Sequence, residues 1–538
     1  MTSTTRRSFL ASTTCVAAAG AFASVAGVAT AGESEQAWDY EADLIIIGAG
    51  GAGLMAALAA SEEGATSFIF EKGHRQGGDT AISEQGYQAP VPHRVMEETG
   101  KEDSTEAWIA ENVNSHCWSR KGLRGEPEVG DLSWVTKLCD LSDSTFAWTE
   151  DVAGIEWASN SGFQSNCFGQ PVWETTYPRS FNATNRIMPN LIDMSEADDN
   201  IQVIINARVF EIVMDNGRAI GARAVVEGEG VKSAHARKGV LIASGSFNGD
   251  DGMVEKYLGA EAANLTNHNT SWNTGDGIKL AEQCGAALRD MDLGTAYLPC
   301  TRGSRTMIAF NSWGRYTDLN EDQMFRAPDA GENEYMGGGE AGKNLPGMLI
   351  NYDGVRYASE TSGYNVGGYL LSLQKWGQGF YVVDNDAAWL EDGSFLVKGV
   401  TYESDNFISA DTLEELAYRM NVPVEAFVAE VEKYNGFVDA GEDADFGRAM
   451  KGVPRLEKPP FYAVPLESQH YTTYGGIAVD VDTRVLDINN EPIPGLYAAG
   501  IVCGSFTEQA GIYYGSGVAQ ALIFGRYAGQ IIASETNV

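Results

Sequence analysis

Cysteine is scarce in this chain, and its few copies are far apart. The 538 residues include seven cysteines, at positions 15, 117, 139, 167, 284, 300 and 503. No two of them have the C-x-x-C spacing of a redox or metal site, and no C-x-x-C-H haem motif occurs. Most are expected to be small buried hydrophobic groups. Disulfides, or an iron–sulfur cluster held by cysteines distant in the sequence, remain alternatives.

Basic residues are also few. The chain has 37 Lys and Arg against 74 Asp and Glu, a formal net charge of −37. A field of that sign repels phosphate backbones, which argues against nucleic acid as a partner. It would also repel a dicarboxylate unless a local basic pocket opposed it. The length and the 43% of hydrophobic residues predict a globular protein of two or three lobes with an ample core.

Long apolar runs are missing after the first thirty residues. At the start, Arg6 and Arg7 precede Phe9 and a weakly apolar stretch, which ends in the small-x-small pattern of 29–31. Basic, then apolar, then small is the order of a signal peptide, here of the twin-arginine type, over residues 1–31. This predicts export of the folded, cofactor-loaded protein across the cytoplasmic membrane. A membrane anchor is the alternative, but threonines and a glycine interrupt the run.

A dinucleotide-binding fingerprint follows this leader. The apolar run 43–47 has the pattern of a buried parallel strand, and the sequence GAGGAG of 48–53 comes directly after it, before an Ala- and Leu-rich helix. A second strand, 67–70, ends in Glu71, which lies 23 positions after Gly48. A Gly-rich turn between strand and helix, with an acidic residue at this distance, predicts a dinucleotide site.

Each residue of the fingerprint has a physical role. Gly48 permits the tight turn, Gly50 lets the backbone approach a pyrophosphate, and Gly53 lets the helix pack on the strand. The N-terminus of the helix offers free N–H groups and the positive end of its dipole to the phosphates. Glu71 is placed to accept hydrogen bonds from the adenosine ribose.

Two further segments favour FAD over a nicotinamide cofactor. Small and hydroxylated residues in 77–83 suit a loop that lies against a pyrophosphate and a ribityl chain. The segment 238–245 predicts a later strand of the same sheet, ending in Ser-Gly. No second strand–GxGxxG–helix unit exists for a nicotinamide. Electrons are therefore not expected from a tightly bound NAD(P)H.

Several landmarks together carry a family resemblance. They are the fingerprint, the strand end 243–245, the segment 273–278, the Gly-Val-Arg-Tyr of 354–357 with Glu360, the run 493–500 and the closing 525–529. From about Asp43 to Gly529 the chain resembles the fumarate reductase and 3-ketosteroid dehydrogenase flavoprotein superfamily. The resemblance implies an α/β fold: a Rossmann-like FAD-binding domain of 32–292 and 459–538, with an inserted α+β capping domain of 293–458. The active site would lie between cap and flavin, and two cap helices are expected within 411–434.

The resemblance also implies which residues bind FAD. They are Gly48, Gly50, Ala52, Gly53, Glu71, Lys72, Gly78, Asp79, Thr80, Val209, Ala243, Gly245, Asp276, Gly500, Ile501 and Val518. Flavin-linking members carry a histidine in the loop after the Gly-Gly turn, and 81–86 contains none, so FAD would be bound non-covalently. Ile501 departs from the glutamate that most members have at this position.

The chain departs from the acid-reducing members of the superfamily at three positions. Lys343 stands in place of a proton-donating arginine, Thr472 in place of a substrate-binding histidine, and Tyr513 in place of an arginine that clamps a carboxylate. A lysine can still donate a proton, as a point charge, although a solvated loop lysine is an equal alternative. Two neutral positions in an acidic protein disfavour a dianionic substrate. His470 lies nearby but out of register and is interpreted as structural.

The ketosteroid branch gives a better match. Its Tyr-x-Gly-x-Gly element resembles 513–517, where Tyr513 and the N–H of Gly517 would polarise a carbonyl oxygen. Tyr364 follows Arg356 and Glu360 at the spacing of the family's catalytic tyrosine and would act as a general acid or base. The third tyrosine of the ketosteroid pattern is not assigned.

With this resemblance, the sequence predicts an exported FAD-dependent reductase of an activated C=C bond. The substrate would be a neutral, apolar, steroid-like enone or unsaturated lactone, such as a cardiac glycoside. Hydride would come from flavin N5 and a proton from Tyr364 or Lys343. One dinucleotide site and no haem motif imply electrons from a membrane-bound cytochrome or quinol donor. The alternatives are a 3-ketosteroid dehydrogenase running in the oxidative direction, a fumarate- or urocanate-type acid reductase, and a non-catalytic flavin- or ligand-binding protein.

Overall fold

The structure, a computed structural model, describes residues 37–537 with the exception of several segments. Those outside the description are 84–85, 88, 108–131, 160–165, 168–169, 172–180, 184–186, 293–294, 304–345, 361–363, 387, 392–393, 398–399, 405–406, 449 and 505–515. The predicted signal peptide, 1–31, therefore lies outside the described residues, and export stays a prediction. Within the described part, no helix combines the length and the apolarity that crossing a membrane requires.

The first sheet is built around the fingerprint strand. Its order is β23 (Arg484–Leu486), β24 (Pro492–Ala498), β11 (Gly230–Ile242), β1 (Tyr40–Ile47), β2 (Ser67–Phe70) and β8 (Ile201–Ile204). β1 pairs in parallel with β2 on one side and with β11 on the other, and Leu44 to Ile47 are buried. Because both of its faces are covered, β1 needs a continuous apolar run rather than an alternating one. β24 also pairs in parallel with β11, so strands from both ends of the chain share one α/β sheet.

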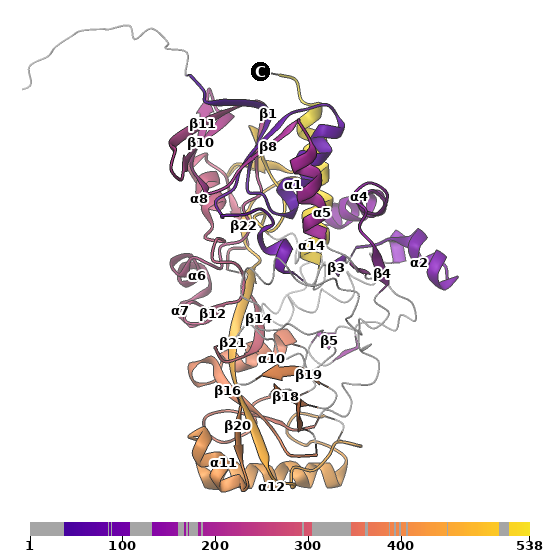
Figure 1. Ribbon diagram of the computed structural model, residues 1–538, viewed down its shortest axis with the longest axis vertical. Coiled ribbons are helices and arrows are strands. Elements are labelled where there is room, and N and C mark those ends of the chain that lie inside the picture. The colour runs from indigo at the N-terminus through magenta and orange to yellow at the C-terminus, as the bar shows by residue number, and fades with distance from the viewer. Residues whose placement is uncertain are drawn as a thin grey trace, which may run out of the picture. The chain divides into compact units, whose positions relative to one another are not determined.

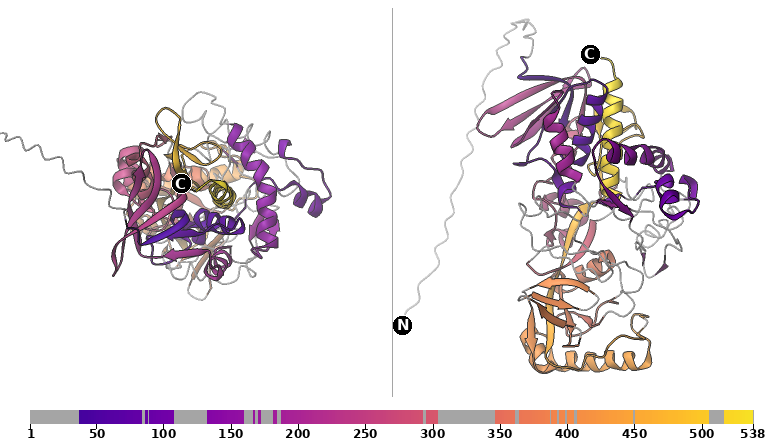
Figure 2. Two further views of the ribbon diagram at one scale, coloured as in Figure 1. Left: turned by 90° about the horizontal axis from the view of Figure 1, so that it is seen from above. Right: turned by 45° about the vertical axis from the view of Figure 1, so that its right-hand side comes forward.

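Three helices pack together beside this sheet (Figure 1): α1 (Gly51–Glu62), α5 (Ile187–Ala197) and α14 (Ser516–Ser534). Figure 2 also shows the indigo α1 and the yellow α14 side by side. Small residues allow this close approach, since a Cβ atom on Gly529 would lie 2.1 Å from the backbone oxygen of Ala56. The antiparallel strands β9 (Ala207–Asp215) and β10 (Arg218–Val226) extend the sheet from β11. The C-terminal helix thus directly supports the fingerprint helix.

A second sheet forms the core of the predicted cap. Its order is β12 (Thr266–Asn267), β21 (Phe461–Thr473), β16 (Gln378–Val383) and β15 (Met348–Ile350), and β14 (Thr295–Thr301) and β20 (Ile408–Ala410) also pair with β21. One buried cluster includes Leu371 of α10 (Tyr364–Ser372). The other includes Leu416 of α11 (Leu413–Met420) and Phe427 of α12 (Val424–Ala440).

The two cap helices begin where the sequence predicts. Thr412 is the N-cap of α11, and its side chain accepts a hydrogen bond from the Glu415 N–H. Pro423 is the N-cap of α12. An N-cap oxygen satisfies one of the free N–H groups of the first helical turn, which is why such residues mark a helix start. The second helix continues to Ala440, beyond the predicted stretch.

Strand β21 belongs to the second sheet although it begins at Phe461, inside the predicted second part of the FAD-binding domain. β12, at Thr266–Asn267, pairs with it from inside the predicted first part. After β21 the chain passes to β22 (Gly476–Ile477), which pairs with β13 (Leu288–Arg289). The boundaries at 292/293 and 458/459 therefore stay predictions, and β21 is a direct connection between the cap sheet and the region of the cofactor fold.

The remaining described elements are short, apart from one helix of 20 residues, α4 (Leu132–Asp151). They are η1 (Gly78–Ile82), β3 (Gly86–Tyr87), α2 (Pro92–Thr99), β4 (Trp157–Ser159), β5 (Asn166–Cys167), β6 (Gln170–Pro171), β7 (Phe181–Ala183), α6 (Asp251–Leu258), α7 (Ala260–Ala263), α8 (Asp276–Gln283), η4 (Lys375–Gly377), β17 (Ala388–Glu391), β18 (Ser394–Val397) and β19 (Val400–Ser404).

Candidate active site

A cleft of about 870 Å³, which includes space open to solvent, lies at the carboxyl ends of the first sheet's strands. This is the edge at which parallel α/β sheets bind their ligands. The cleft is lined by all the predicted cofactor-binding residues except Gly53 and Val518. Segments as distant in sequence as Ile47 and Ala521 meet in its walls.

Glycine is required at the three fingerprint positions for different structural reasons. Gly48 has a φ of 108°, and a Cβ atom there would lie 2.6 Å from the oxygen of Ala243. A Cβ on Gly53 would lie 2.0 Å from the oxygen of Gly48, so Gly53 acts through helix–strand packing and not as part of the cleft wall. Gly50 differs, because a Cβ there would meet nothing closer than the Gly77 oxygen at 4.0 Å. At Gly50 the bare backbone therefore faces open space in the cleft.

The N-terminus of α1 is built to receive negative charge. Gly50, its N-cap, makes no side-chain cap, and the first turn contains no acidic residue. The first N–H groups of a helix have no acceptor within the helix itself. In α1 the Gly51 N–H donates to Thr80 Oγ1 at 3.3 Å. Together with the positive end of the helix dipole, these groups suit a pyrophosphate.

Glu71 binds the loops on both sides of it. Its carboxylate accepts the Ala49 N–H at 2.7 Å and the Gly73 N–H at 2.5 Å. Burial raises the pKa of this carboxyl, and the two N–H donors partly oppose that rise. Since a carboxylate has about four lone-pair sites, both oxygens can accept a further hydrogen bond from a ribose hydroxyl in the cleft.

Asp276, another acidic residue of the cleft, forms ion pairs with two basic side chains of the protein. Asp276 contacts Lys72 Nζ at 3.1 Å and the guanidinium of Arg208 in a bidentate pair at 3.1 and 3.2 Å. Burial alone would raise the pKa of Asp276, but the hydrogen bonds and charges of Arg208 and Lys72 outweigh it and lower the pKa. Asp276 is therefore shared by two cations, and the group of three side chains keeps one net positive charge in the cleft.

Asp79 joins two distant loops. Its carboxylate accepts hydrogen bonds from the Thr270 N–H at 3.1 Å, from Thr270 Oγ1 at 2.7 Å and from the Asn273 amide. Sequence reasoning missed Thr270, Trp272 and Asn273 as residues of the cleft, although the landmark 273–278 begins among them. That landmark is the signal that could have extended the site by three residues.

The structure places the catalytic candidates unevenly. Lys343 and Tyr513 lie outside the described residues. Tyr364 is the first residue of α10, and Gly517 is the second of α14. Among the described residues, a Cβ on Gly517 would meet no atom within 4 Å. The role of its N–H in binding a carbonyl oxygen stays a prediction.

The end of β21 carries no charged group in place of the missing histidine. His470 is 1% exposed, and its Nδ1 has no hydrogen-bond partner. Burial lowers the pKa of His470 to about 4, so the ring is neutral at pH 7. Thr473 at the end of the strand is buried, and its Oγ1 accepts the Phe247 N–H at 3.4 Å.

The chain matches the FAD-binding domain family over residues 43–518. The protein belongs to this family. It is 27% identical to the digoxin reductase of Eggerthella lenta, over 92% of this chain and 88% of that one. It is 26% identical to the probable fumarate reductase Ifc3 of Shewanella frigidimarina, over 90% and 74%. Among solved structures, the 3-ketosteroid-Δ4-(5α)-dehydrogenase of Rhodococcus jostii RHA1 in complex with 4-androstene-3,17-dione is similar, with a TM-score of 0.67, 23% identity and coverage of 92% and 99%.

The protein is thus an FAD-dependent oxidoreductase that acts on C=C bonds. A further observation indicates that the cleft is suited to a polar cofactor. Ser244 lines the cleft, and its Oγ is buried without a hydrogen-bond partner. A polar cofactor in the cleft would supply one, as it would for the first N–H groups of α1.

Metal ligands are not grouped in the part of the chain that the structure describes. No set of three or more His, Cys, Asp or Glu there could hold a metal ion. Cys139, Cys284, Cys300 and Cys503 are free thiols. Burial raises the pKa of the Cys284 thiol to about 11, so it remains protonated at neutral pH. These described cysteines have the character of small buried groups rather than of reactive ones.

Proposed function

We propose that this flavoprotein reduces the activated C=C bond of a neutral, steroid-like enone or unsaturated lactone, such as a cardiac glycoside. The observation that carries the proposal is the end of β21. There a threonine replaces the histidine of acid-reducing relatives, and the neighbouring His470 is buried and neutral at pH 7. A dicarboxylate would find no positive charge on the residues of this strand end, in a protein of net charge −37. The similarity to a digoxin reductase supports the same substrate class.

The proposed residues have separate tasks. FAD, when bound and reduced, supplies the hydride. Tyr513 and the Gly517 N–H hold the carbonyl oxygen of the substrate and stabilise the negative charge that develops there. Tyr364 or Lys343 delivers a proton to the α-carbon. An apolar substrate would be oriented through contact area rather than through ion pairs.

The electron source and the location belong to the same proposal. The leader of 1–31 directs the protein across the cytoplasmic membrane, where a membrane-bound cytochrome or quinol donor reduces the flavin. The reverse reaction, in which a 3-ketosteroid is dehydrogenated, uses the same residues and would require an electron acceptor of higher potential. Because the chain is also similar in sequence to a probable fumarate reductase, an unsaturated acid is the second candidate substrate.

The test is anaerobic reoxidation of the reduced flavin. Purified protein is reduced with dithionite, and fumarate, urocanate, a 3-keto-4-ene steroid and a cardenolide lactone are added singly while flavin absorbance is followed. We expect rapid reoxidation by the steroid or the lactone and none by the acids. Rapid reoxidation by fumarate or urocanate would show that basic groups away from the end of β21 bind the carboxylate, and the acid-reductase candidate would replace this proposal.

A tyrosine variant tests the carbonyl site. Tyr513→Phe removes one hydrogen-bond donor to the oxyanion and should lower the reoxidation rate about 100- to 1,000-fold. Tyr418→Phe is the matched control, because Tyr418 lies on α11 and is 79% exposed. Equal rates for the two variants would remove Tyr513 from the site.

A further inference from the structure

An aromatic side chain forms part of the cleft wall without belonging to the core. In the described part of the chain, the aromatic residues that line the cleft are Phe70 and Trp272. Phe70 is 1% exposed and packs in the core around the first sheet. Trp272 is only half-buried. Because a large apolar ring left partly in water gains free energy when a ligand covers it, Trp272 has the character of a binding residue.

The indole ring of Trp272 packs on the backbone of Gly73. A Cβ atom on Gly73 would lie 2.7 Å from Cε3 and 2.8 Å from Cζ3 of the indole, and 3.0 Å from Glu71 Oε1. The φ of Gly73 is outside the left-handed region, so the backbone conformation does not require glycine here. Glycine instead leaves room for the ring. The ring therefore lies next to the carboxylate that is predicted to bind the adenosine ribose.

The loop after Glu71 supports the ring and the chain that follows it. The His74 ring meets the indole edge-on, with the two ring centres 4.9 Å apart and the planes at 90°. The Thr274 N–H donates to the Trp272 oxygen at 2.9 Å, and Lys72 Nζ donates to Thr274 Oγ1 at 2.6 Å. The indole is thus fixed against this loop, and the rest of its surface lines the cleft.

We call residues 270–273, which carry Trp272, the clasp. Asp79 holds the clasp on both sides of the indole. Its Oδ1 accepts the Thr270 N–H at 3.1 Å and Thr270 Oγ1 at 2.7 Å, and its Oδ2 accepts the Asn273 amide. Asn273 also packs on the end of the neighbouring strand, since a Cβ on Gly245 would lie 2.5 Å from its Oδ1. The clasp is therefore fixed between two walls of the cleft.

We propose that Trp272 is a further FAD-binding residue, whose indole covers the adenosine half of the cofactor beside Glu71. Asp79 is a positioning residue in this proposal, because its side chain acts through the clasp. Contacts of this kind matter most where FAD is bound non-covalently, as the absence of a histidine in 81–86 predicts. The inference concerns the cofactor and does not depend on the substrate proposed above.

The first experiment measures FAD and ADP on the holoenzyme. Stepwise dilution, with the fluorescence of released flavin, gives the Kd of FAD, and displacement of FAD by added ADP gives the Ki of ADP. Trp272→Ala should raise both constants by the same factor, about 5- to 100-fold, as expected for the loss of an aromatic ring against adenine. Trp272→Phe keeps a ring and should raise them less.

Two results would overturn the assignment. Unchanged constants in Trp272→Ala would show that the indole does not touch the cofactor. A weaker FAD with an unchanged ADP would place Trp272 at the flavin half. If Trp272→Ala does not fold, Trp272→Leu, which keeps apolar volume without an aromatic ring, takes its place in the same measurements.

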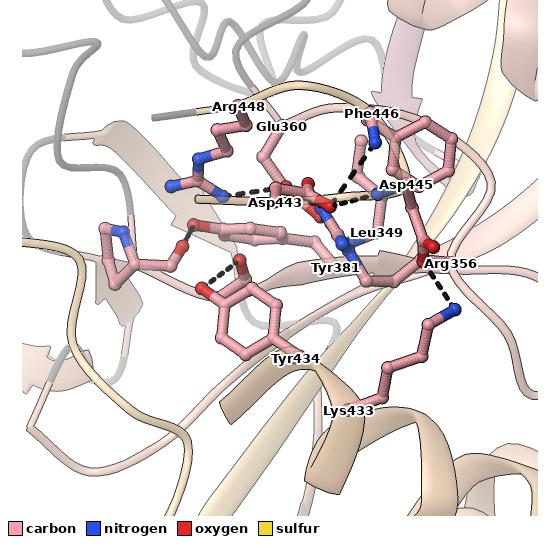
Figure 3. Close-up of polar contacts among 12 residues, drawn as sticks. Leu349, Arg356, Glu360, Tyr381, Lys433, Tyr434, Asp443, Asp445, Phe446 and Arg448 are labelled. Carbon is pink, nitrogen blue, oxygen red and sulfur yellow. Dashed lines mark hydrogen bonds and ion pairs between the residues drawn. The ribbon is translucent and has the colours of Figure 1, made fainter. Parts of the chain in front are cut away.

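The cap supplies a control for general destabilisation (Figure 3). A buried ion cluster lies there, in which Glu360 accepts two hydrogen bonds from Arg356, one from Arg448 and one from the Leu349 N–H. Tyr434, whose ring lies under the Arg356 guanidinium, donates a buried hydrogen bond to a backbone oxygen at 3.0 Å. Tyr434→Phe should lower the melting temperature and leave both constants within about 2-fold, because the described lining of the cleft includes none of these residues. A loss of FAD affinity as large as in Trp272→Ala would mean that general destabilisation explains both.

Double-mutant cycles test how the ring is held. Gly73→Ala should weaken FAD at least about 5-fold by displacing the indole, but less than about 2-fold in the Trp272→Ala protein, which has room for the methyl group. Asp79→Asn should likewise weaken FAD only where Trp272 is present. Fully multiplicative effects of Asp79→Asn would overturn its positioning role, and multiplicative effects of Gly73→Ala would overturn the packing of the indole as the reason for this glycine.

Discussion

At the scale of single residues, Gly48 and Gly50 differ in what a methyl group would meet. Gly50 has φ −79° and ψ −172°, a conformation open to any residue, and a Cβ there finds only the Gly77 oxygen at 4.0 Å. Gly48 is in the left-handed region and has no room. Gly50 is therefore glycine for the sake of the cofactor, and Gly48 for the sake of the fold.

A pair of alanine substitutions tests this division. Gly50→Ala should leave the urea-unfolding free energy of the flavin-free protein within about 0.5 kcal/mol of the wild type. It should weaken FAD binding at least about 10-fold, measured by flavin fluorescence titration, because the methyl group enters the cofactor's space. Gly48→Ala should instead destabilise the flavin-free protein by about 1 to 3 kcal/mol. Full FAD affinity in Gly50→Ala would place the pyrophosphate elsewhere in the cleft.

The same residues show what a sequence can reveal. Gly53 and Glu71 could be predicted because their partners are near in sequence: Gly48 for Gly53, and the N–H groups of Ala49 and Gly73 for Glu71. Asp79 could be named but its role could not, since its partners Thr270 and Asn273 lie 191 and 194 residues away. The four donors to Glu360 likewise come from segments that only the folded chain brings together.

At the scale of elements, α1 and α14 depend on small residues along their contact. Cβ atoms on Gly525 and Gly529 would lie 2.4 and 2.1 Å from the backbone oxygens of Ala52 and Ala56. The two helix backbones therefore approach more closely than larger side chains would permit. Since the N-terminus of α1 lines the cleft, this contact fixes the position of the proposed pyrophosphate site.

A larger residue in this contact should act on both stability and cofactor binding. We expect Gly529→Leu to destabilise the protein by about 3 kcal/mol, because a packed interface has no room for added methylenes. FAD affinity should fall as α1 moves. Gly436→Ala in α12 is the control: its Cβ would meet nothing within 4 Å, and it should gain about 0.5 to 1 kcal/mol. Chemical denaturation measures the change of unfolding free energy in each of the two variants. An unchanged stability of Gly529→Leu would contradict the close packing.

Elements differ in how far local sequence determines them. β1 and the cap helices could be predicted, because a buried parallel strand and a capped helix leave patterns in consecutive residues. The place of β21 could not. It carries Pro465 and has no alternation of apolar and polar residues, and it is fixed by pairing with β14 and β16, which are distant in sequence.

At the scale of the whole molecule, the cleft collects residues from almost the full length of the chain. Its walls include Gly48 near the beginning, Arg208 and Asn273 in the middle, and Ala521 near the end. A ligand that contacts all of them adds further connections between these distant segments. FAD should therefore contribute to the stability of the fold as well as to its chemistry.

Removing FAD tests this coupling. A ligand that binds only the folded state stabilises it by RT ln(1 + [L]/Kd), which is about 2.7 kcal/mol at 100 times Kd. The melting temperature of flavin-free protein should rise with each tenfold increase of free FAD, by the equivalent of about 1.4 kcal/mol. ADP should give part of the effect, because the Gly-rich turn, the N-terminus of α1 and Glu71 are built for that half of the cofactor. A melting temperature independent of FAD would mean that this cleft does not hold the cofactor, whereas a response to FAD without any response to ADP would move the binding energy from the fingerprint to the flavin end.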